Sequence, residues 1–100
     1  MGGSRDVNGE TVFKLSDDVS LQDLGADEGG VILQIATGEL YTVNDTAVAF
    51  LARLDGAASV RDVADRVAAE FNVPLGTALA DLVELAAELE SESLLVRLGG

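Results

Sequence analysis

Acidic side chains carry most of the chemistry available to this sequence. Eighteen of the 100 residues are Asp or Glu, and there is no His or Cys. Carboxylates alone can act as general acids and bases or hold hard cations, but these roles require a cleft that shifts their pKa values or a regular calcium-loop spacing. The sequence shows neither feature. The missing residue types also exclude thiolate nucleophiles, disulfides, Ser–His triads and the usual zinc sites. We therefore predict no catalytic residue, no metal site and no cofactor.

One group of carboxylates is nevertheless ordered along a predicted helix. At about 100° per residue they form a stripe beside the apolar face of a helix expected at about 76–91. Leu85 lies where the apolar and acidic stripes meet. Such a stripe is usually a solvated face, and it also suits a surface that contacts a peptide or another partner. The stripe consists of Asp81, Glu84, Glu88 and Glu92.

The net charge of −12 limits the classes of partner. Nucleic acids and anionic membrane surfaces are bound through clustered cations, whereas the six Lys and Arg residues are spread singly along the chain. We therefore predict no nucleic-acid and no membrane partner. No apolar run reaches the ~18–20 residues that span a bilayer, and the first 15 residues lack the apolar core of a signal peptide. These features favour a cytoplasmic protein.

The positions of the apolar residues predict one domain with its strands before its helices. Residues 1–16 are expected to be a flexible tail with a short extended piece at 12–15, and residues 17–98 to be the domain. Alternation predicts an edge strand at 19–24 and a hairpin. The hairpin consists of strands 31–36 and 39–43, joined by a turn in which Gly38 takes a positive φ.

Three helices are expected to follow. Asn44 is placed to cap the first helix, with Gly56 as its stop. Ser59 opens a second helix that ends before Pro74, and the third runs from about 76 to 91. The apolar tail at 93–96 is expected to close the chain against the core. Strands followed by helices indicate an α+β fold.

Several segments resemble the PqqD-like domains, which are also called RiPP recognition elements. The strongest are the GELYTVN segment at 38–44, the Leu54-Asp55-Gly56 stop and the Asp81-Leu82 step. The SVRDVADRVAAEFNV segment at 59–73 is part of the same resemblance. The resemblance covers about residues 17–98. It implies a winged-helix-like fold with an N-terminal three-stranded antiparallel sheet followed by three helices.

The same resemblance implies a function without catalysis. Members bind the leader segment of a ribosomally made precursor peptide as a β-strand added between the third strand and the third helix, and present it to modifying enzymes. The chain is most similar to the free-standing lasso-peptide type, whose partners are a leader protease and a cyclase. The alternative is a PqqD-like peptide chaperone for a radical-SAM enzyme of pyrroloquinoline quinone or mycofactocin assembly. On this sequence, the peptide-binding residues would be Glu39, Leu40, Tyr41, Thr42, Val43, Asp81, Leu82, Leu85, Glu88 and Leu89.

The residues themselves support this binding mode independently. An exposed strand edge offers unpaired N–H and C=O groups to an extended peptide. Tyr41 suits either the core or the ligand, and Leu82 and Leu89 suit either the core or the groove, so Asp81 and Leu85 are the better candidates for contact. We expect the protein to act as a monomer.

Two other classes of protein match the chain in size or in topology but need sequence features that it lacks. A winged-helix DNA-binding domain needs a basic recognition helix, whereas Arg61 and Arg66 sit among acidic residues. An acyl carrier protein needs an Asp-Ser-Leu at a helix start. The nearest match, Glu92-Ser93-Leu94, comes at a helix end.

Overall fold

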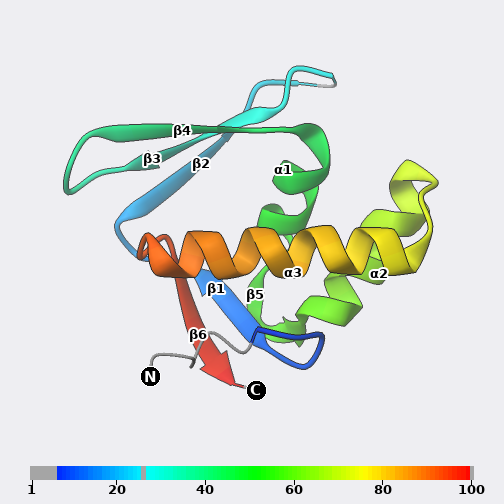
Figure 1. Ribbon diagram of the computed structural model, residues 1–100. Helices are drawn as coiled ribbons and strands as arrows, with labels where there is room; N and C mark the ends of the chain where they lie inside the picture. Colours follow the sequence, from blue (N-terminus) through cyan, green and yellow to red (C-terminus); the bar gives the residue numbers. More distant parts are fainter. Residues whose placement is uncertain (1–6, 26, 100) are drawn as a thin grey trace.

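The computed structural model describes residues 7–25 and 27–99, and these form an α+β fold. In this part of the chain three helices accompany two three-stranded antiparallel sheets (Figure 1). The order is β1 (Val12–Leu15), β2 (Val19–Asp23), β3 (Gly30–Gln34), β4 (Glu39–Val43), α1 (Asp45–Ala52), β5 (Asp55–Ser59), α2 (Val60–Phe71), α3 (Leu75–Ser91) and β6 (Leu95–Gly99).

The first sheet has the strand order β2-β3-β4 and confirms the predicted N-terminal three-stranded sheet. β2 lies at one edge, as expected. β3 ends at Gln34, two residues earlier than predicted, because the Gly38 amide donates to the Gln34 carbonyl at 2.7 Å and closes a turn over 35–38. Gly38 has the positive φ, 77°, that the turn was predicted to need.

The second sheet, with the order β5-β1-β6, was not predicted. The segment expected to be a helix stop around Gly56 instead forms β5, since α1 already ends at Ala52. The apolar tail extends into β6, where Leu94 and Leu95 are buried as expected. This sheet joins segments that are distant in the chain.

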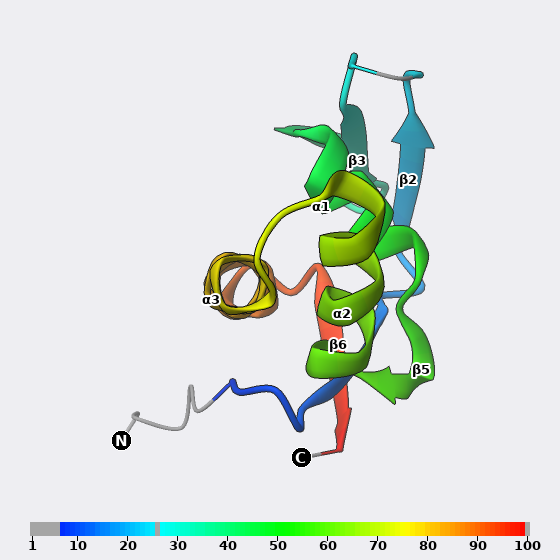
Figure 2. The ribbon, with the colours of Figure 1, turned by 90° about the vertical axis from the view of Figure 1, so that its right-hand side faces the viewer.

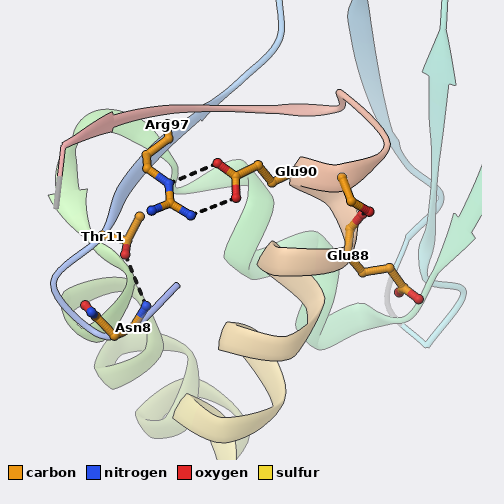
Figure 3. Close-up of polar contacts among 6 residues, drawn as sticks. Asn8, Thr11, Glu88, Glu90 and Arg97 are labelled. Atoms are coloured by element: carbon orange, nitrogen blue, oxygen red, sulfur yellow. Dashed lines mark hydrogen bonds and ion pairs between the residues drawn. The ribbon is translucent and has the colours of Figure 1, made fainter. Parts of the chain in front are cut away.

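The start of the folded unit also differs from the expected boundary at residue 17. The first six residues of the predicted flexible tail lie outside the described part of the chain. The extended piece at 12–15 is β1, the central strand of the second sheet, and Phe13 in it is fully buried. Thr11 is equally buried, and its hydroxyl accepts from the Asn8 amide at 3.1 Å (Figure 3). Strand pairing and burial therefore place residues before 17 inside the fold.

The helix starts follow the predicted caps. The Asn44 side chain accepts from the Ala47 amide at 2.9 Å, and the Ser59 hydroxyl accepts from the Asp62 amide at 3.2 Å. α2 ends at Phe71, before a left-handed Asn72, and α3 begins just after Pro74. The sequence also predicts an apolar stripe of Ala47, Phe50, Leu51 and Leu54; all four are buried, and Leu54 lies just beyond the end of α1 at Ala52.

The two sheets lie at opposite ends of the molecule, and α3 crosses between them. In Figure 1, α3 runs across the front, with β2-β3-β4 above it and the second sheet below. Figure 2 views α3 nearly end-on and shows α2 beside it, with its axis running across that of α3. The core fills the space between the helices and both sheets, with Phe13, Ile32 and Phe50 completely buried. In the described part of the chain, no helix combines the length and apolar character needed to cross a membrane.

Candidate peptide-binding groove

The edge of β4 that faces away from β3 has no partner strand among the described residues. The Ile35 amide donates to the backbone carbonyl of Asp18, the residue just before β2, at 2.8 Å. Since the bonding direction alternates along a strand, the odd-numbered residues of β3 direct their backbone groups toward β2. The even-numbered ones then face β4, and the register pairs Ile32 with Tyr41. Backbone groups alternate along a strand, so the N–H and C=O of Leu40 and Thr42 point to the open edge.

The C-terminal half of β4, the start of α1 and the middle of α3 line a hollow of about 360 Å³. It brings together five residues predicted for the site from two distant segments. Leu82 is buried with 4% exposure, whereas Leu85 is half-buried and Asp81 is exposed. The lining residues are Thr42, Val43, Asn44, Thr46, Ala47, Asp81, Leu82, Glu84 and Leu85. Of the predicted residues Thr42, Val43, Asp81, Leu82 and Leu85 all line this hollow.

A second hollow, of about 300 Å³, continues along α3 toward its C-terminus. It is lined by Asp81, Glu84, Leu85 and Glu88, so three carboxylates surround one apolar side chain. Asp81, Glu84 and Leu85 line both hollows. We call the two hollows together the β4–α3 groove.

The ring of Tyr41 lies on the core face of its sheet, and its hydroxyl reaches the surface of the protein. It stands opposite Ile32, which is fully buried, and its half-buried ring packs against the core. Its hydroxyl donates to the Glu39 carboxylate at 3.0 Å. Burial of the ring, this hydrogen bond and the negative charges of Glu39 and Glu92 all raise the pKa of Tyr41 above its usual 10.0. The influence of Glu92 shows that the C-terminal end of α3 lies near this hydroxyl.

The other predicted site residues take different positions. Leu40 lies on the face of the sheet opposite to Tyr41 and is 66% exposed. Glu39 is exposed at the start of β4, and Glu88 is exposed on α3. Leu89 is only 5% exposed and belongs to the hydrophobic core, so it supports α3 from behind and does not line the groove.

The prediction of site residues omitted four that line the groove. Glu84 was recognised in the acidic stripe but not assigned to the site, and Asn44 was interpreted as a cap. Thr46, in the first turn of α1, was not singled out, and Ala47 was expected only on the apolar stripe of that helix. Asn44 is the sequence feature from which these two residues could have been predicted to line the groove. A helix cap that directly follows β4 holds the first turn of α1 against the end of that strand.

A bidentate ion pair fixes the orientation of α3. The Arg97 guanidinium, on β6, donates to both oxygens of Glu90 at 2.8 and 2.9 Å, and both side chains are largely shielded from solvent. Figure 3 shows Glu90 directed at Arg97 while Glu88 projects from another side of the helix. Arg97 also lies 5.8 Å from the Phe13 ring centroid. The pair therefore ties one side of α3 to the second sheet and leaves Glu88 on the groove side.

The groove is suited to binding and has no constellation for catalysis. Its lining offers carboxylates, hydroxyls and apolar side chains, without a nucleophile paired to a base. Within residues 7–25 and 27–99, no group of acidic side chains has the arrangement needed to hold a metal ion. What the geometry provides is a free strand edge beside a helix with an apolar and acidic face.

Comparison with known proteins places this geometry in a family. Residues 29–95 match the family described as coenzyme PQQ synthesis protein D (PqqD). This interval includes the whole of β4 and α3. The chain belongs to the PqqD family. Comparison with curated protein sequences gives no significant match.

Solved structures support the same assignment. A lasso peptide synthetase B1 complexed with the leader peptide is 30% identical over 84% of this chain and 96% of its own, with a TM-score of 0.69. The PqqD part of Methylobacterium extorquens PqqCD, a stand-alone RiPP recognition element, is 24% identical over 90% and 94%, with a TM-score of 0.75. TbiB1 in complex with the TbiA(beta) leader peptide is 24% identical over 82% and 93%, with a TM-score of 0.67. The last two establish the fold, which agrees with the family match.

Proposed function

We propose that this protein binds the leader segment of a ribosomally made precursor peptide as an extra β-strand along β4, facing α3. The observation that carries the proposal is the open edge of β4 beside the β4–α3 groove. Leu40 and Thr42 direct their backbone groups outward there, which gives up to four main-chain hydrogen bonds to an incoming strand. The 30% identical lasso peptide synthetase B1 was solved with a leader peptide bound, which supports the same occupant here.

The remaining predicted contacts follow from this placement. Leu85 and Asp81 would contact the side chains of the guest strand that face α3, and Glu88 would contact those near the other end of the groove. Glu39, Tyr41 and Val43 would contribute through the strand to which the guest pairs, and Leu82 and Leu89 by holding α3 in place. The protein itself would perform no chemistry.

The partner enzymes are proposed from similarity. The 30% identity to a lasso peptide synthetase B1 favours a leader protease and a cyclase as recipients of the bound precursor. The family match and the PqqD structure favour the alternative, a radical-SAM enzyme. One chain supplies both walls of the groove, so we propose that the monomer is the binding unit.

Amide hydrogen exchange tests the binding mode without changing the protein. In the free protein, the Leu40 and Thr42 amides should exchange fast, because they face solvent at the edge, whereas the Tyr41 and Val43 amides, which face β3, should be protected. A synthetic leader peptide that binds this protein should protect the Leu40 and Thr42 amides. Binding of that leader with both amides still in fast exchange would contradict strand addition at β4.

A further inference from the structure

All the charged side chains that line the β4–α3 groove are acidic. Asp81, Glu84 and Glu88 line its two hollows, and Glu39 and Glu92 lie at its far end beside the Tyr41 hydroxyl. Neither hollow has a Lys or Arg among its lining residues. Asp81, Glu84 and Glu88 are all exposed, so they are available to an occupant of the groove.

The cations of the described chain lie on other parts of the fold. Arg53 pairs with Glu70 at 2.6 Å between α1 and α2, and Arg97 pairs with Glu90 on the other side of α3. Lys14 lies on β1, 3.7 Å from Asp17. Arg61 and Arg66 belong to α2, the first against Gly9 and the second near Asp55. No internal partner among these side chains neutralises the groove carboxylates.

The spacing of these carboxylates fits an extended strand. Asp81 and Glu88 are seven residues apart on a helix, or about 10 Å along its axis at about 1.5 Å per residue. Side chains on one face of a strand repeat every ~7 Å. Two such side chains from a guest strand on β4 therefore fall within reach of the three α3 carboxylates, with Leu85 between them.

We propose that the peptide recognised by this protein is a cationic one, with Lys or Arg at two positions separated by one residue on the face of the strand that meets α3. This inference rests on the proposed function, since the free edge and the groove define the site and the carboxylates set the charge of its occupant. A long cationic side chain can lay its methylene stem over Leu85 while its charge reaches Asp81, Glu84 or Glu88. Charge complementarity of this kind selects partners and speeds association more than it adds affinity.

The test is a display selection of random 12-residue peptides on the folded protein, at about 50 mM NaCl, where surface charges are weakly screened. Two variants carry the same change in net charge. The groove variant is D81N/E84Q/E88Q, and the control variant E10Q/E28Q/D65N alters three exposed carboxylates that do not line the groove. The protein and the control variant should enrich cationic peptides with Lys or Arg two positions apart, and the groove variant should not.

Affinity and hydrogen exchange then separate the possible outcomes. The best peptide should bind the groove variant roughly tenfold more weakly than the control variant, and the difference should close at about 500 mM NaCl. Equal enrichment of cationic peptides by both variants would overturn the inference, because the net charge alone would explain it. Neutral or acidic peptides that protect the Leu40 and Thr42 amides would overturn the cationic preference and leave strand addition standing. A selection in which no peptide protects those amides would count against strand addition itself.

Discussion

Leu85 is the one apolar side chain that lines both hollows of the groove without being buried in the core. Its neighbours on α3 divide into two groups. Leu82 and Leu89 are buried and hold the helix, whereas Asp81 and Glu88 are exposed and offer charge. Leu85 therefore stands between the residues that stabilise the fold and those that face a ligand, which makes it the most informative position to change.

We expect Leu85→Arg to weaken leader binding at least about tenfold, because it removes an apolar contact and places a cation where the guest strand is expected to carry one. The fold should persist, since this side chain is partly exposed. Isothermal titration with the cognate leader measures the affinity, and circular dichroism checks the fold. Val96→Arg, an exposed apolar position on β6, is the matched control and should bind normally. Unchanged affinity in folded Leu85→Arg would contradict the placement of the guest strand.

Tyr41 allows a second prediction at the scale of a single residue. It is the only tyrosine and there is no Trp, so tyrosinate absorbance reports its ionisation directly. Its pKa should lie above 10.0, and Glu39→Gln should lower it, because this change removes a negative charge and weakens the hydrogen bond that holds the phenol neutral.

The sign of the associated stability follows from the raised pKa. The folded state holds the phenolic proton more tightly than the unfolded chain, so the contribution is complete below the ordinary pKa and is lost as pH rises through the raised one. A spectrophotometric titration of the folded protein from neutral to alkaline pH measures the pKa of Tyr41. A Tyr41 pKa at or below 10.0 in the unchanged protein would contradict the environment described for the hydroxyl.

At the scale of elements, the first sheet is anchored to α1 through the loop between β2 and β3. The Asp45 carboxylate, in the first turn of α1, accepts from the Asp27 and Gly29 amides at 2.6 and 2.7 Å. Gly29 has a φ of 69°, and a Cβ there would lie 2.3 Å from the carbonyl oxygen of Val43 at the end of β4. The position of β4 therefore depends on the absence of a side chain at Gly29.

Gly29→Ala should destabilise the protein by several kcal/mol, through about 1–2 kcal/mol of backbone strain and a further ~1–3 kcal/mol of overpacking. Gly38→Ala is the matched control, because Gly38 has a similar φ of 77° but a Cβ there would meet nothing within 4 Å. It should show only the strain. Urea denaturation of both variants measures the difference, and equal losses would show that the contact with Val43 is relieved at little cost.

The elements that could be predicted from sequence were those with a local signal. Alternating apolar residues identified the hairpin of β3 and β4, while Asn44 and Ser59 marked the starts of α1 and α2. β4 and most of α3 were placed correctly, and five of the residues predicted for the site line the larger hollow. The residues missed at the start of α1 line the groove only because tertiary packing brings that turn against α3.

The second sheet could not be predicted because its pairings are not local. β5 reads Asp-Gly-Ala-Ala-Ser and lacks the β-branched and aromatic residues typical of strands. It becomes a strand because β1 lies beside it, and β1 in turn pairs with β6 at the other end of the chain. Gly56, expected to stop a helix, instead takes a φ of 82° in β5, where a Cβ would lie 2.8 Å from Leu98 of β6.

At the scale of the whole molecule, the net charge of −12 acts on folding and on binding in opposite ways. Self-repulsion destabilises the compact state. The same field, where it is concentrated along α3, would attract a cationic peptide. Salt screens both interactions.

We therefore expect added NaCl, up to about 0.5 M, to raise the melting temperature while it weakens leader binding. Differential scanning calorimetry and titration in the same buffers measure the two quantities. The variant E10Q/E28Q/D65N should gain less thermal stability from salt, because it carries less negative charge. A melting temperature that falls with salt would show that attraction between charges outweighs repulsion in the folded protein.

The pairing of Val12 with Gly99 brings the first and last strands of the described chain side by side. Domains whose ends lie together tolerate insertion into a loop of a host protein, and circular permutation. Here both ends leave from the sheet that contains β1 and β6, while the open edge belongs to the sheet that contains β4. A modifying enzyme could therefore carry this fold as an insert or as a fused module at either end without its own chain crossing the groove.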